Sequence, residues 1–332
     1  MRNSRGRTHH LLFFLLLSHI LFTAGCGTDS RVKVIKLAHG LNPSHPVHQA
    51  MEFLAERVAE KSDGRMRIDI YPSEQLGSER ECLELLQIGS LEMTKVSCSV
   101  LEGFVPSMSV LSLPYIFRDE EHGFKVLEGD IGKKLLLAGE KVWLRGLCFY
   151  DAGSRSFYTK DKPVLSPADL VGMKIRTQES PTSMKMVQAL GGSPTPISWG
   201  ELYSALQQGV VDGAENNPPS FHLSRHYDVC KFYSLDEHTG VPDVLLINTN
   251  IWRGLSSEFQ EILQEAADES AQLQKNLWKK ATQTALEHVQ KSGVKIYYPD
   301  KKLFAEKVRS IYEEYRNQPE LYKLIQEIQA VR

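Results

Sequence analysis

The segment 172–219 constrains the fold more than any other part of the chain, because short apolar runs alternate there with helix signals. The first apolar run, 173–175, ends at Arg176, and Ser180 and Pro181 then mark the start of a helix. The same order of strand and helix is repeated once and closes on a third apolar run. A βαβαβ order of this kind is typical of a parallel sheet, in which the ligand crevice lies at the carboxyl ends of the strands.

The second half of this segment carries the next helix and the third strand. We expect a capping box between Ser198 and Glu201 to open the helix, and the strand to lie at 210–211 before the polar run 212–217. An arginine at the end of such a strand offers a planar, permanently charged fork to a carboxylate. The residues expected where a strand has just ended or a helix begins are Arg176, Trp199 and Asn216.

The letters of this segment also carry a resemblance to a known family. GMKIR, followed by P-x-S-W-x-E-L-Y-x-A-L-Q-Q-G-V-V-D-G-x-E-N, resembles the signature of the DctP-type solute-binding proteins of TRAP transporters. The resemblance covers the chain from Val34 to the C-terminal helices. It implies an α/β fold built as a two-lobed, periplasmic-binding-protein-like clamp (class II-like), which closes on its ligand, with a long helix spanning both lobes.

Outside this segment the alternation of strands and helices continues. We expect a helix from Ser78 to Gly89 with Ile88 facing inward, one helix over 120–137, and a helix over 255–291 that would run to roughly 50 Å. Further strands are expected at 32–37, 66–70, 91–100, 142–150, 244–247 and 294–298, and further helices at 47–58, 303–312 and 321–328.

Breaks in the pattern near 153 and 241 divide the chain. Lobe I is expected to comprise 32–153 and 242–282, and lobe II to comprise 154–241 and 283–332. The long helix, which contains neither proline nor glycine over 255–291, is expected to bridge the two lobes.

The N-terminus has the pattern of a secretory signal peptide over 1–25, with a basic start and an apolar stretch at 11–22. The following Cys26 completes a sequence that resembles a bacterial lipobox, which implies a lipidated cysteine and a short tether over 26–31. The alternative is ordinary cleavage near Cys26 and a free soluble protein. Either interpretation places the protein outside the cytoplasm, in the periplasm or at the cell surface.

Composition excludes several classes of protein. The formal net charge of −2 offers no basic surface to nucleic acid.

The spacings of His39, His45 and His48 match no common zinc pattern, so no metal site is expected. The remaining cysteines are expected to be buried thiols, although three disulfide connectivities are open to four of them; they are Cys82, Cys98, Cys148 and Cys230.

The resemblance assigns ligand-binding roles within lobe II. It implies that Arg176 binds the ligand carboxylate with both guanidinium nitrogens, and that Asn216 donates to the same carboxylate or to a neighbouring hydroxyl. Arg155 lies where family members often place a second arginine. Trp199 would form a pocket wall, with core packing as its alternative role, and Asn217 could face either the site or solvent.

Lobe I would contribute groups that recognise the far end of the ligand. Glu79 is expected near the ligand, although a carboxylate in the first turn of a helix is also stabilised by the helix dipole. Ser97 is a candidate of the same kind at the end of the next strand. His39 ends the first strand and could reach the crevice, or it could be an ordinary loop histidine.

These features together predict a solute-binding protein of a TRAP transporter that captures a small organic acid and delivers it to a membrane permease. The resemblance favours a sugar acid such as a uronate, followed by a C4-dicarboxylate and then a 2-oxo acid. The residues that carry this ranking are Glu79, Trp199, Asn216, Asn217 and the runs 236–239 and 242–246. A ligand sensor for a membrane receptor is the alternative. No cofactor is expected, and the chain shows no G-x-S-x-G, H-E-x-x-H or P-loop motif that would indicate an enzyme.

Overall fold

The computed structural model describes residues 32–332 of the 332-residue chain. The predicted signal peptide over 1–25, the predicted lipidation site Cys26 and the tether over 26–31 lie outside the described residues. Within 32–332, none of the helices combines the length and apolar character that crossing a membrane requires.

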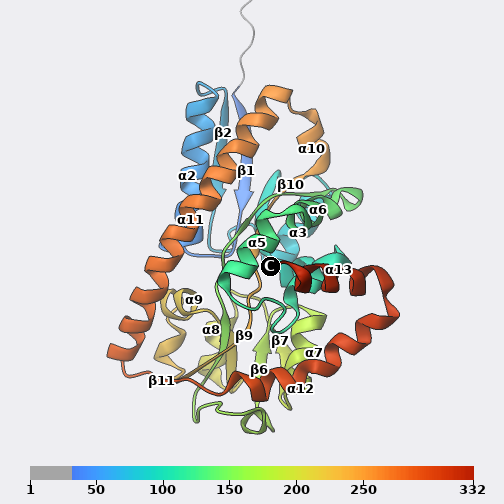
Figure 1. Ribbon diagram of the computed structural model, residues 1–332. Coiled ribbons are helices and arrows are strands. Elements are labelled where there is room, and N and C mark those ends of the chain that lie inside the picture. The colour runs from blue at the N-terminus through green and yellow to red at the C-terminus, as the bar shows by residue number, and fades with distance from the viewer. Residues whose placement is uncertain (1–31) are drawn as a thin grey trace, which may run out of the picture.

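The first unit of the fold is a five-stranded sheet in the order β2-β1-β3-β10-β4. Its strands are β1 (Lys33–Ala38), β2 (Met66–Tyr71), β3 (Met93–Ser97), β4 (Leu144–Tyr150) and β10 (Asp243–Asn248). β1 runs parallel to β2 and β3, whereas β10 is antiparallel to both of its neighbours. The helix α2 (Pro46–Lys61) lies beside this sheet, at the top of Figure 1.

The second unit is a six-stranded sheet in the order β11-β9-β5-β8-β6-β7. Its strands are β5 (Arg155–Thr159), β6 (Lys174–Thr177), β7 (Ser193–Pro196), β8 (Gly213–Asn216), β9 (Phe232–Thr239) and β11 (Lys295–Tyr297). β6 is parallel to β7 and β8, with α7 (Pro181–Ala189) and α8 (Leu202–Gln208) as the connections. This is the predicted βαβαβ order.

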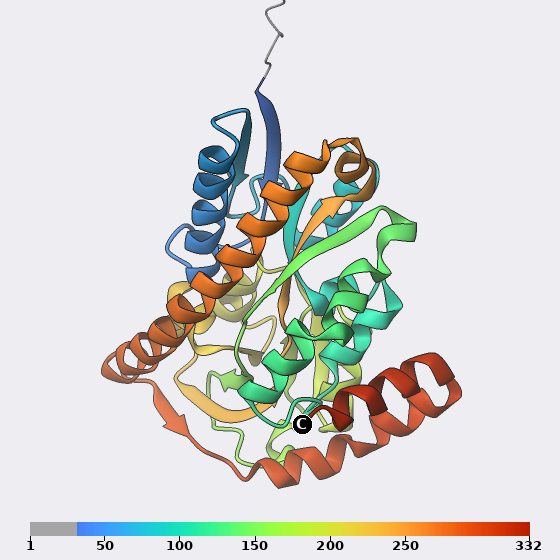
Figure 2. The same cartoon turned by 45° about the horizontal axis from the view of Figure 1, so that its top comes forward.

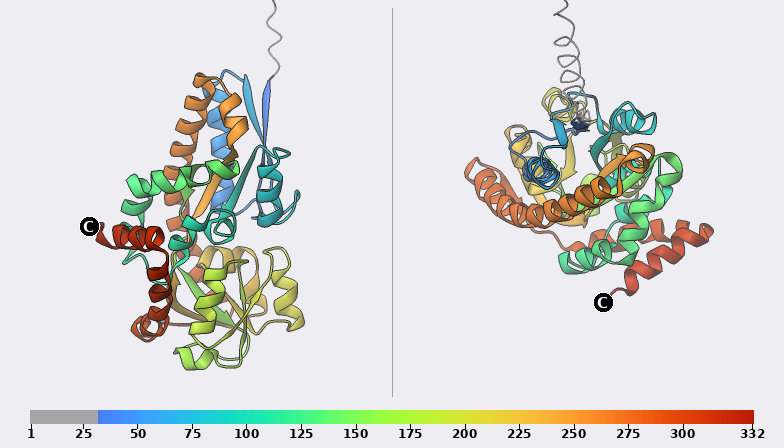
Figure 3. Two further views of the ribbon diagram at one scale, coloured as in Figure 1. Left: turned by 90° about the vertical axis from the view of Figure 1, so that its right-hand side faces the viewer. Right: turned by 90° about the horizontal axis from the view of Figure 1, so that it is seen from above.

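Three parts of the chain connect the two sheets. The chain leaves the first sheet after β4, passes through 151–154 to β5, and returns through 240–242 between β9 and β10. The third connection is α11 (Ser257–Lys291), a 35-residue helix that packs against α2 in the first unit and α9 (Pro218–Leu223) in the second. Figures 1, 2 and 3 show it running along both units, which confirms the predicted two-lobed α/β clamp with a long spanning helix.

The first crossing is fixed to α11 by side chains. Gln274 accepts a hydrogen bond from the backbone nitrogen of Asp151 (2.9 Å) and donates to its carbonyl oxygen (2.7 Å). Gly153 has a φ of +55°, and a Cβ atom there would lie 2.7 Å from Nε1 of Trp278. A larger residue at 153 would therefore have to displace the indole as well as adopt a left-handed backbone.

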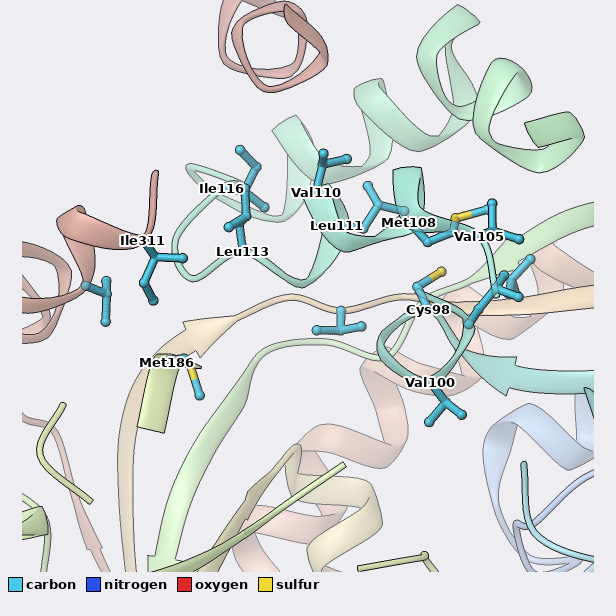
Figure 4. Close-up of a cluster of buried hydrophobic side chains, with 14 of the residues drawn as sticks. Cys98, Val100, Val105, Met108, Val110, Leu111, Leu113, Ile116, Met186 and Ile311 are labelled. Carbon is cyan, nitrogen blue, oxygen red and sulfur yellow. The ribbon is translucent and has the colours of Figure 1, made fainter. Parts of the chain in front are cut away.

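An apolar cluster joins the units on one side (Figure 4). Met108 and Leu111, from the segment that follows β3, belong to the same cluster as Met186 of α7 and Ile311 of α12 (Lys301–Glu314). The C-terminal helix α13 (Pro319–Ala330) packs on the 3₁₀ segment Pro106–Ser112. The C-terminal helices therefore cover the side of the molecule where the units meet.

Several local predictions were wrong. The region 120–137 forms two helices, α5 (Glu120–Glu128) and α6 (Asp130–Ala138), because Gly129 between them is in an extended conformation. Ile88 is 75% exposed beyond the end of α3 (Glu79–Gln87). The region 91–100 contains β3 and then the short helix α4 (Cys98–Leu101), and α10 (Thr249–Gly254) precedes the long helix.

Two further corrections concern the segment 172–219. The residues 210–211 form the turn after α8, and the strand β8 begins at Gly213, where Ile175 of β6 is its partner. Ser198 donates to the Glu201 side chain (2.7 Å), but no side chain caps α8, which begins at Leu202. The capping box is therefore not formed. All four cysteines of the described residues are buried and free, as expected.

Candidate functional site

A cavity lined by residues of both units lies between the two sheets. Its walls come from the carboxyl ends of β3, β6 and β8 and from both crossings, which is where open α/β sheets bind ligands. Of the predicted site residues, those that line it are Glu79, Ser97, Arg155, Arg176, Trp199, Asn216 and Asn217.

Arg176, on β6, presents an unpaired buried donor at this cavity. Its side chain is almost fully buried, and Nε donates to the carbonyl oxygen of Ile197 (2.8 Å). Nη1 is buried and has no hydrogen-bond partner among residues 32–332. Burial lowers the pKa of Arg176 from its ordinary value, but a guanidinium stays charged in proteins. An unpaired buried cation is costly, and a ligand carboxylate would satisfy it.

Asn216, at the end of β8, has its amide oriented by its neighbours. Its Oδ1 accepts from Nη1 of Arg155 and from the backbone nitrogen of Asn217, each at 2.9 Å. Because the oxygen is engaged twice, the Nδ2 group is the part of the amide that remains to donate to a ligand.

Arg155, the first residue of β5, is neutralised by Glu215. Its Nε donates to Glu215 Oε2 (2.5 Å), and Nη2 donates to Oε1 (2.9 Å) and to the carbonyl oxygen (2.8 Å) of the same residue. Although burial acts to raise it, the pKa of Glu215 is lowered to about 2 by Arg155 and His238. Arg155 therefore positions Asn216, and its charge is already balanced before any ligand binds.

The run 236–239 lies behind this wall. Asp236 and His238 do not line the cavity. The His238 ring lies between two carboxylates, with Nδ1 2.7 Å from Asp236 Oδ2 and Nε2 3.4 Å from Glu215 Oε2. Burial acts to lower the pKa of His238, but the two carboxylates raise it to about 9. The run therefore supports the orientation of Arg155 through Glu215, and none of its residues lines the cavity.

The opposite wall, from the first sheet, carries a buried ion cluster. Nζ of Lys95, on β3, lies 3.0 Å from Glu79 Oε1 and 3.2 Å from Asp243 Oδ2. The backbone nitrogen of Ser97 also donates to both oxygens of Glu79, at 3.2 Å each. Burial acts to lower the pKa of Lys95, yet the charges of Asp243 and Glu79 raise it above its ordinary value. Burial raises the pKa of Asp243, and Lys95 limits the rise.

Sequence analysis did not identify Lys95 as a site residue. The signal available was a lysine within a strand whose other residues are buried, because a buried lysine requires carboxylate partners.

His39 does not line the cavity, contrary to expectation. Its Nε2 lies 2.9 Å from Nδ1 of His48, and its Nδ1 accepts from the backbone nitrogen of Leu41. His45, the N-cap of α2, lines the cavity instead and approaches Ser220 Oγ at 3.3 Å. Burial lowers the pKa of His45 to about 3, so its imidazole is neutral. No cluster of three or more metal-binding side chains occurs in the part of the chain that the structure describes.

The remaining predicted residues have structural partners as well as cavity contacts. Trp199 packs edge-on against His226 with 5.2 Å between ring centres, and the guanidinium carbon of Arg176 lies 5.9 Å from the Trp199 ring centre. Asn217 caps α9, because its Oδ1 accepts from the backbone nitrogen of Ser220 (2.8 Å).

Hydrogen bonds also cross the cleft between the two units. Ser97 Oγ donates to Gln178 (3.4 Å), the Gly200 nitrogen donates to Glu74 (3.1 Å), and Nδ2 of Asn42 donates to the carbonyl of Leu223 (3.2 Å). The clamp is therefore closed around the cavity.

Comparison with known proteins identifies the family. Residues 37–318 match the model of the bacterial extracellular solute-binding proteins of family 7, DctP. The uncharacterized protein YiiZ of Salmonella typhimurium is 38% identical over 301 residues, which are 90% of this chain and 92% of that protein.

Solved structures of TRAP solute-binding proteins are similar to this chain in both sequence and fold. A TRAP periplasmic solute-binding protein from Bradyrhizobium, in complex with galacturonate, is 38% identical with a TM-score of 0.87, covering 90% of this chain and 99% of that chain. One from Anaerococcus prevotii, with bound glucuronate, is 37% identical with a TM-score of 0.88, covering 90% and 97%. These are binding proteins, in agreement with the prediction that the chain is not an enzyme. The chain belongs to the family 7 extracellular solute-binding proteins, the DctP family that serves TRAP transporters.

Proposed function

We propose that this protein captures a hexuronate, a sugar acid with one carboxylate such as glucuronate or galacturonate, for a TRAP transporter. The observation that carries the proposal is the buried, unpaired Nη1 of Arg176 in the wall of the cavity. The ligand carboxylate would bond to Arg176 and to Nδ2 of Asn216, and both groups belong to the second sheet. The uronates bound by the relatives from Bradyrhizobium and Anaerococcus support this ligand class.

Closure of the clamp would deliver the acid. We propose that lobe I, comprising 32–153 and 242–282, and lobe II, comprising 154–241 and 283–332, move together when the ligand connects their walls. The closed form would then dock on the membrane permease. Closure of this kind is a population shift, driven by contacts that exist only in the closed state.

The protein would act outside the cytoplasm and be held at a membrane by lipid on Cys26. The proposal rests on the basic and apolar stretches of 1–25 and on the small residues before Cys26. More than one acyl chain on this cysteine would anchor the protein stably, because a single chain gives only marginal binding.

Thermal unfolding of residues 27–332 against a panel of uronates, aldonates, C4-dicarboxylates and 2-oxo acids tests the ligand class. A ligand at about 100 times its Kd stabilises the folded state by about 2.7 kcal/mol, which raises the unfolding midpoint measurably. A selective shift by a uronate supports the proposal, and a selective shift by any other class contradicts it.

The role of Arg176 is tested by Arg176→Met, with Arg67→Met as the matched control at a position whose side chain is 58% exposed. Removing one partner of a buried charged pair costs about 2–5 kcal/mol, so we expect uronate affinity to fall roughly 30-fold to several thousand-fold. Titration calorimetry measures both variants. A folded Arg176→Met that binds the uronate within threefold of the unmodified protein would refute the assigned role.

A further inference from the structure

The cations that line the cavity differ in whether a carboxylate of the protein already neutralises them. The cationic side chains that line it are Lys95, Arg155 and Arg176. Arg155 is bound to Glu215 through Nε and Nη2, and Lys95 is bound to both Glu79 and Asp243. Arg176 is thus the one cation among these lining residues without a carboxylate partner. One unpaired cation can neutralise one carboxylate of a ligand.

The wall from the first sheet has excess negative charge. One ammonium, on Lys95, faces two carboxylates, and its side chain is only 2% exposed. Glu79 and Asp243 retain 16% and 12% exposure where they line the cavity. A second ligand carboxylate at this wall would meet like charges in a partly desolvated site, which disfavours it.

The same wall offers hydrogen-bond acceptors. Glu79 Oε2 accepts only the 3.2 Å bond from the Ser97 nitrogen, and Asp243 Oδ1 has no hydrogen-bond partner within 32–332. Each carboxylate oxygen has two lone pairs, so both residues can accept further hydrogen bonds. Sugar hydroxyls supply the donors that these oxygens require, whereas a carboxylate supplies none.

The backbone fixes this acceptor pair. Asp243 opens β10 and is opposite Ser97 in the antiparallel register, and Leu245 is opposite Lys95. Glu79 begins α3 and is held by the Ser97 nitrogen, so both carboxylates are positioned by one strand pair before a ligand enters. Acceptors that are already oriented bind with a smaller entropic cost.

We propose that Glu79 and Asp243, held by Lys95, form a hydroxyl-recognition subsite that selects acids with one carboxylate and excludes those with a second carboxylate at the far end. This inference rests on the proposed binding of the ligand carboxylate by Arg176. It predicts that the dicarboxylic aldarate of a sugar is rejected even where the corresponding uronate binds.

Titration calorimetry with D-glucuronate and D-glucarate tests the subsite in the unmodified protein and in Glu79→Gln. Glu84→Gln is the matched control, because Glu84 lies on the same helix with a side chain 53% exposed. Loss of a charge-assisted acceptor should weaken glucuronate roughly 10- to 100-fold in Glu79→Gln. The ratio of the Kd for glucarate to the Kd for glucuronate should decrease at the same time. Both Kd values of Glu84→Gln should match those of the unmodified protein.

Asp243→Asn provides a second variant if Glu79→Gln does not fold, with the same expected direction. Glucarate binding within tenfold of glucuronate in the unmodified protein would overturn the inference, as would a folded Glu79→Gln whose glucuronate affinity changes less than threefold. Failure of the proposed function looks different, because the unmodified protein would then bind no uronate at all.

Discussion

Replacing Glu215 by glutamine tests whether the fixed geometry of the carboxylate site depends on a buried ion network. Glu215 is 1% exposed and accepts two hydrogen bonds from the Arg155 guanidinium through its carboxylate, at 2.5 and 2.9 Å. A glutamine amide keeps one oxygen but places an NH₂ against an N–H donor, and it leaves the Arg155 charge uncompensated. Breaking a buried pair from one side costs about 3–5 kcal/mol, a large part of the 5–15 kcal/mol that stabilises a typical folded protein.

Urea unfolding followed by circular dichroism measures the free energy of unfolding. The control is Glu314→Gln, which breaks the Lys185–Glu314 ion pair, whose side chains are 49% and 53% exposed, and should cost at most about 1 kcal/mol. Glu215→Gln should also weaken uronate binding, since Arg155 would no longer hold Asn216 Oδ1. If the two variants lose the same small amount of stability and both bind normally, Glu215 has no positioning role and the reasoning is refuted.

Two further predictions follow from His238 and Cys26. The pKa of His238 is raised to about 9 in the folded protein, so the stability it contributes, about 3 kcal/mol, is complete below pH 6.5 and lost as the pH rises through 9. The free energy of unfolding should be smaller at pH 9.5 than at pH 6, and this difference should largely disappear in His238→Asn. An equal difference in both proteins would contradict the assignment. For Cys26, palmitate labelling of the full chain in bacterial cells should mark the unmodified protein and not Cys26→Ala, and label on neither would exclude the anchor.

The overall fold could be predicted from the sequence because its elements are encoded locally. The βαβαβ order over 172–219 follows from short apolar runs, Pro181 at a helix start and a glycine at each helix end. The long helix follows from its uninterrupted periodicity over 257–291. The prediction of a strand at 210–211 was wrong, because these two apolar residues lie in the turn after α8. Gly209, the C-cap of that helix, has a left-handed backbone.

The candidate site could be predicted only in part, since its charge pairing is set by contacts between distant residues. Lys95 meets Asp243 only because β3 and β10 are neighbours, although 148 positions separate the two residues. Arg155 and Asn216 were both identified, but their hydrogen bond and the balancing carboxylate of Glu215 depend on the pairing of β5 with β8. No local pattern shows that Arg155 is balanced while Arg176 is not.

Under the proposed binding mode, this difference between the two arginines would make closure depend on the ligand. The cross-cleft hydrogen bonds made by Ser97, Gly200 and Asn42 contribute about 0.5–1.5 kcal/mol each to the closed form. In this closed form Nη1 of Arg176 is buried without a partner among residues 32–332, at a cost of about 1–3 kcal/mol or more for a charged group. These two contributions to the closed form are of similar size and opposite sign. A carboxylate that binds Arg176 as proposed would remove this cost in the closed form, and such a differential affinity would shift the population toward closure.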